Sequence, residues 1–391
     1  MTIVGDTEER AALRDAVAKL AGRYGHDYFR RCSDTHTEPA ELWAELGAAG
    51  FLGVHLPEEY GGGGGGMSDL AVVVEELSAQ GLPLLMTVIS PAICGSIISR
   101  HGDDQLKRRW LPGIADGSRK MAFAITEPEA GSNSHEISTT AHPDGSAEHA
   151  ERGWRLRGTK YWTSGIDEAD AVLVVTRHPE AGAGGRRPLS LFVVPTDSPG
   201  LTWQLIPAAL RQPEQQFTVF LDDVPVGREA LVGRAGHGLR QVFAGLNPER
   251  ITAACISNGI ARYALDKACG YARDRTVWTV PIGAHQGVAH PLAEAWIGTQ
   301  SARLMAFRAA ALFDAGQDAA EASNVAKFVA ADSSLRALDQ AMQVHGGNGM
   351  ALEYGLADLW FVARMLKTAP VSREMVLNFV AQRSLGLPAS Y

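Results

Sequence analysis

The sequence changes its pattern twice along the chain, and this change constrains the fold more than any other feature. Residues 121 to about 232 contain short alternating or β-branched apolar runs, separated by turns that carry Gly and Pro. Such runs are typical of strands, whereas the flanking segments have the three-to-four spacing of helices. The pattern predicts an α+β protein with an N-terminal helical domain (1–120), a middle antiparallel β domain (121–236) and a C-terminal four-helix bundle (237–391). The expected strands are 121–126, 154–162, 171–178, 189–196, 201–206 and 217–226.

The helices of both flanks follow from apolar periodicity. Before residue 121 they are expected at 8–24, 39–49, 68–80 and 84–101, and Pro91 should kink or interrupt the last of them. After residue 237, alanine-rich helices are expected at 249–273, 290–315, 319–345 and 371–385. Six consecutive glycines at 61–66 have high backbone entropy and no side chains to pack, so they predict a loop.

Composition and charge exclude several classes of function. With 46% apolar and 20% charged residues, the chain is an ordinary globular protein. A net charge of −8 without a basic stripe argues against nucleic-acid binding, and no apolar run is long enough for a membrane span. The acidic N-terminus lacks the basic-then-apolar order of a signal peptide, so a cytoplasmic, bacterial-type location is expected. Scattered cysteines without metal-ligand spacing predict free thiols and no metal site; they are Cys32, Cys94, Cys255 and Cys269.

The segment from Met121 to Ser134 carries the first candidate site. Pro128 fixes φ and has no backbone N–H, so a strand that begins at Met121 should end before it. Gly131 lets the backbone approach a ligand closely, and Ser132 adds a hydroxyl beside free backbone N–H groups. These features suit a phosphate, although by themselves they indicate only a weak anion-binding turn.

The same segment, TEPEAGSN, closely resembles the flavin-binding signature Thr-Glu-Pro-x-Ala-Gly-Ser-Asp of acyl-CoA dehydrogenases, with Asn133 in place of Asp. The order of helical domain, β domain and helical bundle also matches the fold of that family over essentially the whole chain. The resemblance implies that the cofactor is FAD. It places Phe123, Ile125 and Thr126 against the flavin ring and Gly131 and Ser132 at the diphosphate, with Ser132 also near the substrate.

A second cluster lies in GTKYWTSG, residues 158–165. On pattern alone, Trp162 and Ser164 at a strand end more often reflect core packing and a turn. In the family that the chain resembles, the Trp of this motif lies against the isoalloxazine, and a hydroxyl two residues later approaches flavin N5. The resemblance assigns these roles to Trp162 and Ser164, where Thr is common. A hydrogen bond at that position tunes the atom that accepts hydride.

A third set lies in RDRTVWTVPIGAHQ, residues 273–286. The fork of an Arg side chain suits paired phosphate oxygens, although a solvated surface Arg is the more common case. The family has an Arg, an aromatic residue three positions later and a Gln that bind the FAD diphosphate and adenine across a subunit boundary. Arg275, Trp278 and Gln286 fit that spacing, and Thr279 stands where Gly is usual.

Two further motifs lie toward the C-terminus. The segment QVHGGNG is typical of a helix end, with Gly346 and Gly347 as its cap. In the family this loop touches the FAD of the neighbouring subunit, which implicates Gln343 and Gly347. Ser372 and Glu374 fall on positions that often contact the AMP part of FAD. Contacts in trans imply at least a dimer, and the family norm is a homotetramer.

Two positions compete for the catalytic base. Many family members carry it as a Glu near the C-terminus, where this chain has Pro370, which cannot act as a base. A second group, similar to isovaleryl- and long-chain-type dehydrogenases, has a Glu before an Arg at the start of a helix, and Glu249 and Arg250 match it. Asn247 and Pro248 suit the N-cap and first position of that helix, where the helix dipole alone would favour an acidic residue. The resemblance implies that Glu249 is the base and that Arg250 orients this corner or approaches the CoA.

The activity that the resemblance implies is FAD-dependent α,β-dehydrogenation of an acyl-CoA thioester to the trans-2-enoyl-CoA, a step of fatty acid and lipid metabolism. Glu249 would take the α proton while hydride leaves the β carbon for flavin N5, and an electron-transfer flavoprotein would accept the electrons. Three alternatives stay open. They are an acyl-carrier-protein substrate, an O2-using flavin oxidase or monooxygenase on the same fold, and a non-catalytic subunit of a hetero-oligomeric dehydrogenase.

Overall fold

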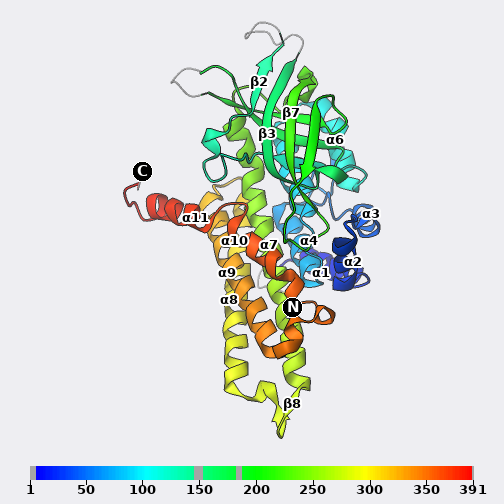
Figure 1. Ribbon diagram of the computed structural model, residues 1–391, viewed down its shortest axis with the longest axis vertical. Coiled ribbons are helices and arrows are strands. Elements are labelled where there is room, and N and C mark those ends of the chain that lie inside the picture. Colours follow the sequence, from blue (N-terminus) through cyan, green and yellow to red (C-terminus); the bar gives the residue numbers. More distant parts are fainter. Residues whose placement is uncertain (1–5, 145–152, 182–186, 390–391) are drawn as a thin grey trace.

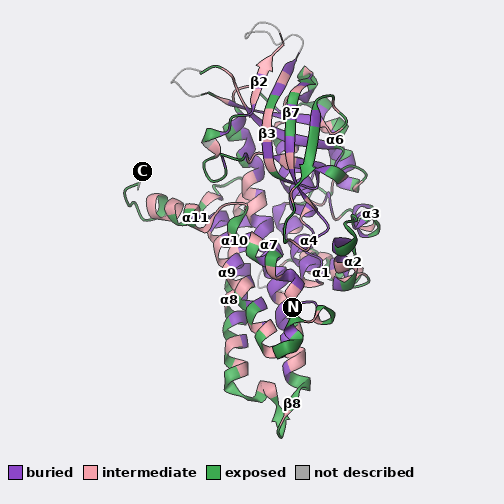
Figure 2. Ribbon diagram, viewed as in Figure 1, coloured by how far each residue is buried: buried purple, intermediate pink, exposed green. Residues whose placement is uncertain are grey.

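The computed structural model describes residues 6–144, 153–181 and 187–389. Figure 1 shows an elongated molecule with a β domain at one end and three long helices that run to the other end. These helices are α7 (Gly238–Asp274), α8 (Gln286–Asp314) and α9 (Ala320–His345). Buried residues gather where the β domain meets the helices, and exposed ones dominate the far end (Figure 2). In the described ranges no helix is long and apolar enough to cross a membrane.

The N-terminal part is helical, as predicted. Its α-helices are α1 (Glu8–Ala21), α2 (Gly25–Thr35), α3 (Ala40–Ala48), α4 (Met67–Ala79), α5 (Ser96–His101) and α6 (Asp104–Asp116). Helices α2 and α6 are not among the expected ones, since α6 contains Pro112 and α2 follows α1 after only a short turn. The expected helix at 84–101 is interrupted by a π-helical segment, η2 (Val88–Gly95), which contains Pro91. Proline has no N–H for the regular α-helical bond, so the predicted interruption is confirmed.

The six glycines form a loop, as predicted, and its backbone lies tightly against the segment before it. The N–H groups of Gly62, Gly63, Gly64 and Gly65 all donate to backbone carbonyls of residues 53–57. A Cβ on Gly62 would stand 2.2 Å from the carbonyl oxygen of Leu56. Glycine is therefore required there by close packing.

The middle domain is one seven-stranded sheet with the order β1-β4-β2-β3-β7-β6, in which β5 also pairs with β4. Its strands are β1 (Met121–Ala124), β2 (Thr140–Pro143), β3 (Trp154–Ser164), β4 (Ala171–Arg177), β5 (Leu189–Pro195), β6 (Leu201–Leu205) and β7 (Gln216–Val226). Most strand pairs are antiparallel, as expected, but β4 pairs in parallel with both β1 and β2. The connection from β1 to β2 does not reverse the direction of the chain, so β1, β2 and β4 run the same way and β3 runs opposite to them.

Strand β4 connects the two hydrophobic cores of the molecule. Leu173 and Val175 pack with the large helical core, whereas Val172 and Val174 pack inside the β domain. A strand that is buried on both faces has a continuous apolar run instead of an alternating one. This packing fastens the sheet to the helices at the edge where β1 lies.

The C-terminal part is a bundle of α7, α8 and α9, followed by α10 (Trp360–Thr368) and α11 (Arg373–Phe379). The predicted start of the first helix is wrong: α7 begins at Gly238 and continues through Pro248, so Asn247 is not an N-cap. A proline inside a helix costs about 3 kcal/mol. Packing of the first turns against the N-terminal helices offsets this cost, since a Cβ on Gly245 would already touch Ile93 and Ile97.

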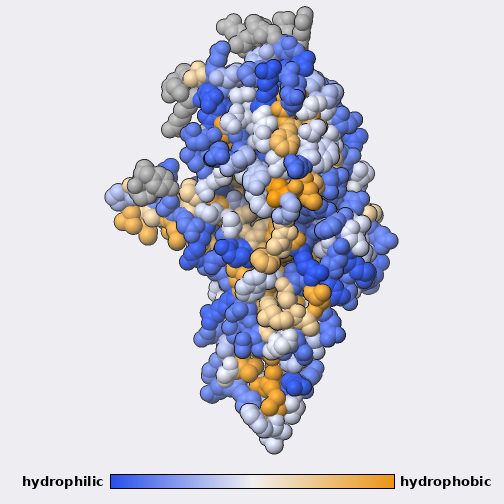
Figure 3. Space-filling view, in the orientation of Figure 1, coloured by the Kyte–Doolittle hydropathy of each residue, from blue (hydrophilic) through white to orange (hydrophobic). Residues whose placement is uncertain are grey.

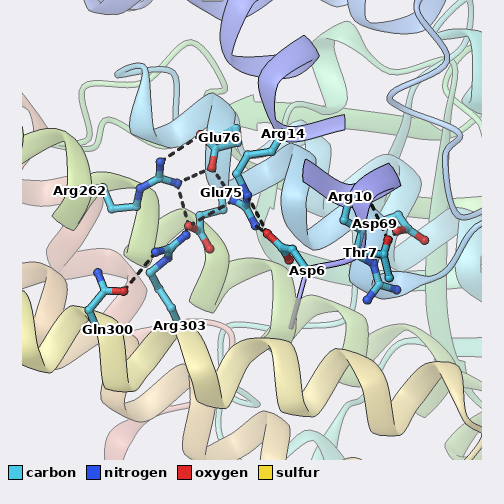
Figure 4. A network of polar contacts seen from close by, with 10 residues as sticks. All are labelled: Asp6, Thr7, Arg10, Arg14, Asp69, Glu75, Glu76, Arg262, Gln300 and Arg303. Carbon is cyan, nitrogen blue, oxygen red and sulfur yellow. Dashed lines mark hydrogen bonds and ion pairs between the residues drawn. The ribbon is translucent and has the colours of Figure 1, made fainter. Parts of the chain in front are cut away.

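A buried network of charges joins the N-terminal helices to the bundle (Figure 4). Glu75 of α4 accepts from Arg262 of α7 at 2.8 Å and from Arg303 of α8 at 2.6 Å. Its neighbour Glu76 pairs with Arg14 of α1 and with Arg262. Carboxylates and guanidinium groups alternate in this network, so each buried charge has a partner of opposite sign.

Candidate active site

The first two motifs meet at the end of β1. The N–H of Tyr161 on β3 donates to the carbonyl oxygen of Thr126 at 2.8 Å, which places the residues after β1 beside GTKYWTSG. The turn that follows closes through Glu127 and Ala130, whose backbones bond to each other. No atom of the described residues lies within 4 Å of the place where a Cβ on Gly131 would stand. The backbone there is open to a ligand, and Ser132 beside it is exposed.

A buried ion pair, which the sequence reasoning missed, holds this junction. The fully buried ammonium of Lys160 donates to Glu127 Oε1 at 2.8 Å and to the Ile125 carbonyl at 3.1 Å. The N–H groups of Ser138 and Thr139 also donate to the Glu127 carboxylate. Despite burial, these partners lower the pKa of Glu127 to about 2, whereas burial lowers the pKa of Lys160 to about 8. The features of the sequence that could have indicated this ion pair are a Lys inside a predicted strand and a Glu before a Pro.

Trp162 stands out from β3 toward solvent. The register of β3 against β7 shifts between Lys160 and Thr163, and within this irregularity Trp162 has φ of 57°. A bulge of this kind re-aims a side chain, and such strain is concentrated at functional sites. The indole is 46% exposed. Two residues later Ser164 is buried, and its Oγ donates to Gln216 Oε1 at 2.8 Å.

Glu249 lies well inside α7 and not in a first turn, so the helix dipole does not account for it. The side chain is partly buried, and no residue of the described ranges donates a hydrogen bond to its carboxylate. Burial raises the pKa of Glu249 to about 7, against the charges of Arg250 and Lys327, which lower it. The pKa of the Cys94 thiol on η2 is raised, first by burial and second by the charge of Glu249. Glu249 therefore lies toward η2, the segment that packs against β1.

Lys327 links the two positions that were considered for the base. Lys327 of α9 donates to the carbonyls of Lys367 and Val371 at 3.1 and 2.5 Å, which ties down the turn that carries Pro370. The same ammonium acts electrostatically on Glu249. Lys327 thus binds the turn that contains Pro370 and also interacts electrostatically with Glu249.

Arg250 is held by its own helix. Its Nη1 donates to Asn247 Oδ1 at 3.1 Å and to the Leu246 carbonyl at 3.3 Å. Its Nε is buried and has no acceptor in the described part of the chain. Burial lowers the pKa of Arg250 against the attraction of Glu249. A buried N–H without an acceptor costs free energy.

Residues of the third and fourth motifs gather at the opposite end of the molecule. Trp278 lies in the hairpin of β8 (Thr276–Val277) and β9 (Val280–Pro281), where it is 88% exposed with φ of 59°. The rings of Tyr271 on α7 and His345 on α9 stack 4.3 Å apart and hold the two helix ends together. Helix α9 ends at His345 and is capped by Gly346, so this prediction is confirmed. The residues concerned are Arg275, Trp278, Gln286, Gln343 and Gly347.

The structure therefore separates the predicted site residues into two groups. The first comprises residues of β1, of the turn after it and of the end of β3, namely Phe123, Ile125, Thr126, Gly131, Ser132, Trp162 and Ser164. The second lies at the β8 end (Figure 1), and one chain does not bring the two groups together. Ser372 caps α11 by accepting from the Met375 N–H at 3.3 Å, and the charge of Glu374 acts on Lys327, so both belong to the side of Glu249.

The first group fits a flavin. An exposed aromatic face, a hydroxyl and an open backbone segment stand together, and the buried Oγ1 of Thr163 and Nε2 of Gln216 have no partner in the described part of the chain. Unpaired buried polar atoms are costly unless a ligand or water meets them.

Comparisons with known proteins agree along the whole chain. Residues 7–118, 122–224 and 236–385 match the acyl-CoA dehydrogenase N-terminal, middle and C-terminal domains. Acyl-CoA dehydrogenase FadE12 of Mycobacterium tuberculosis is 56% identical over 388 residues, 99% of this chain and 98% of that protein. A glutaryl-CoA dehydrogenase of Desulfococcus multivorans is 33% identical over 347 residues, 86% of this chain and 85% of that protein. A solved glutaryl-CoA dehydrogenase with glutaryl-CoA has a TM-score of 0.92 at 27% identity, over 99% and 98% of the two chains.

A protein with this three-domain fold and these matches is an oxidoreductase. More narrowly, the chain belongs to the acyl-CoA dehydrogenase family.

Proposed function

We propose that this protein is an FAD-dependent acyl-CoA dehydrogenase in which Glu249 is the catalytic base. The observation that carries the proposal is the carboxyl of Glu249, which receives no hydrogen bond from the described residues and whose pKa burial raises to about 7. This carboxyl interacts electrostatically with Lys327, which binds the turn that contains Pro370. A general base works best when its pKa lies near the working pH. An ordinary Glu would be a much weaker base, and a Glu in a salt bridge would be held in one place.

The residues of the first group, Glu249 and Arg250 have separate roles in the reaction. Glu249 takes the proton from the α carbon, and the acyl chain that covers it excludes water and strengthens the local electrostatics. Bound FAD supplies the hydride acceptor. Trp162 provides a flat apolar face for the ring, Ser164 a hydroxyl at its N5 edge, and Gly131 and Ser132 an open segment for the diphosphate. The Nε–H of Arg250 has no acceptor in the described part of the chain, and in this proposal it donates to the substrate.

The separation of the two groups supports an FAD site shared between subunits. In this proposal Arg275, Trp278, Gln286, Gln343 and Gly347 of one chain meet the first group of another. An apolar stripe on α8, with Trp296, Ile297 and Leu304 all exposed, supports a second copy as partner. We extend the proposal to a homotetramer and to an electron-transfer flavoprotein as the acceptor of the electrons. Electrons that pass to such a partner do not reduce O2.

The test is anaerobic titration of the purified flavoprotein with short, branched, medium, long and steroid-like acyl-CoAs, followed by flavin absorbance. Wild type should bleach with one acyl class, and Glu249→Gln should lose the reaction by several orders of magnitude because the amide cannot take the proton. Glu353→Gln is the matched control, since it removes an exposed carboxyl and should bleach like wild type. Bleaching that survives in Glu249→Gln would show that another group is the base.

A second arm identifies the electron acceptor. The reduced enzyme is mixed with an electron-transfer flavoprotein or with air-saturated buffer. Rapid reoxidation by the flavoprotein and slow peroxide release support the dehydrogenase. Fast peroxide release in air would instead favour an oxidase.

A further inference from the structure

We propose that Gln216 is a positioning residue that sets the direction in which the Ser164 hydroxyl points. The inference rests on the proposed contact between Ser164 and flavin N5. Ser164 ends β3, Gln216 begins β7, and the two residues are directly opposite in the register of these antiparallel strands. Both side chains are buried, so their mutual bond of 2.8 Å is made out of solvent. Ser164 has a single proton, and in this arrangement the proton goes to Gln216 Oε1.

The other end of the Gln216 amide lacks a partner. Gln216 is only 5% exposed, and its buried Nε2 meets no acceptor in the described ranges. An amide has nearly the same shape after a half-turn that exchanges its oxygen and nitrogen. In the turned orientation Nε2 donates to Ser164 Oγ, and the Ser164 proton is released toward another acceptor. The same contact can therefore make Ser164 either a donor or an acceptor toward the flavin.

The two orientations correspond to the two oxidation states of the flavin. In the oxidised ring N5 is a hydrogen-bond acceptor, so Ser164 has to donate to it while Gln216 donates to Ser164. In the reduced ring N5 carries a hydrogen, so Ser164 has to accept from it and pass its own proton to Gln216 Oε1. An amide offers a donor and an acceptor of similar size, and it serves both states without a change of charge. A carboxylate, which only accepts, could serve just one.

The backbone around Gln216 is held in place, so the two states differ in the orientation of its side-chain amide. On the backbone the strand start is fixed, because the Ile206 N–H donates to the Gln216 carbonyl at 2.8 Å and the Gly165 N–H donates to Gln215 at 2.9 Å. These bonds fix the backbone, and the two orientations differ only by a half-turn of the side-chain amide.

The test uses holoenzyme loaded with FAD that carries ¹⁵N at N5, and it follows the N5-sensitive band in the vibrational spectrum of the oxidised enzyme. Gln216→Glu should hold the Ser164 proton once its carboxyl is ionised, so the band should shift to the position seen in Ser164→Ala. Gln216→Met removes donor and acceptor, and a shift part of the way is expected. Gln215→Glu adds the same charge one residue away and should leave the band unchanged. Spectra are recorded from neutral to alkaline pH so that the new carboxyl titrates.

The double variant Ser164→Ala/Gln216→Met should match Ser164→Ala, because Gln216 acts only through Ser164. A Gln216→Glu band that stays at the wild-type position through alkaline pH, while Ser164→Ala shifts it, overturns the role of Gln216. A wild-type band in Ser164→Ala overturns the Ser164 contact itself, and with it the route from Gln216 to the flavin. If Gln216→Glu does not bind FAD, an unshifted band in Gln216→Met counts against the proposal in the same way. Bleaching of Ser164→Ala by acyl-CoA tests the dehydrogenase function separately.

Discussion

Glu249 has a pKa near 7, where an ordinary Glu has 4.5, because its carboxyl is desolvated in the folded chain. A base takes a proton only when it is ionised, so kcat/KM should rise with pH and level off above about 7. The measurement is the rate of flavin reduction by a fixed acyl-CoA across the pH range in which the protein stays folded. A profile that is already level near pH 5 would mean that Glu249 is not desolvated or is not the base.

Gly131 separates ligand binding from stability at a single residue. Its surroundings leave room for a Cβ, so Gly131→Ala should unfold at nearly the same temperature as wild type when FAD is absent. The added methyl group would stand between the backbone and the diphosphate, and FAD affinity should fall at least about tenfold, which corresponds to about 1.4 kcal/mol. Equilibrium titration with FAD and thermal unfolding of the apoprotein check both halves. Equal loss of stability and affinity would assign Gly131 to folding alone.

At the scale of elements, the joint between β1 and β3 depends on the ion pair of Glu127 and Lys160. Removing one partner, in Lys160→Met or Glu127→Gln, leaves a buried polar group or charge unpaired and should cost about 3–5 kcal/mol of unfolding free energy. The double variant should cost clearly less than the two single changes together. Urea unfolding of the apoprotein gives the cycle. Additive costs would mean that the pair is not coupled.

The same pair sets an acid limit for this joint. The pKa of Glu127 is lowered to about 2 in the folded chain, so its contribution to stability is complete above the ordinary value of 4.5. The contribution is lost as the pH falls from there toward 2. Elements β1 and β3 should therefore separate in acid before the charge-free parts of the helical core loosen.

At the scale of the whole molecule, the exposed apolar residues mark where other copies should bind. Figure 3 shows apolar patches on the outer faces of the helices and at the junction with the β domain, in a surface that is otherwise polar. Trp278, 88% exposed at the tip of the hairpin, is the most solvent-accessible large apolar side chain that the structure describes. Exposure on this scale is typical of an interaction site.

Mixing two inactive variants tests the shared site directly. Glu249→Gln damages the first group and Arg275→Glu repels the diphosphate at the second, so neither homo-oligomer should reduce its flavin. If each site joins two chains across a two-fold axis, a mixed dimer contains one site with both groups intact, and co-refolded protein should regain about a quarter of wild-type activity. No recovery after mixing would place all FAD contacts within one chain.

The sequence by itself determined the order of the three domains and the positions of most strands. Strands β3 to β7 lie where the β-branched runs predict them, and β1 ends before Pro128. These features depend on neighbours within a few residues, where proline geometry and side-chain period act directly. The TEPEAGSN and GTKYWTSG motifs were recognised by their resemblance to signatures of the family, because their local pattern alone indicates only a weak anion-binding turn and a strand end.

Only the tertiary structure decided what joins segments far apart in the chain. The predicted start of α7 was wrong because the packing of α7 on the N-terminal helices outweighs the local tendency of Pro248 to begin a helix. The Glu127–Lys160 pair, the desolvation of Glu249 and the bond from Ser164 to Gln216 each need a partner from another element. Burial and pairing of charges are properties of the assembled core, so no local pattern contains them. The division of the predicted cofactor residues between two ends of the molecule became visible only when the long helices were placed.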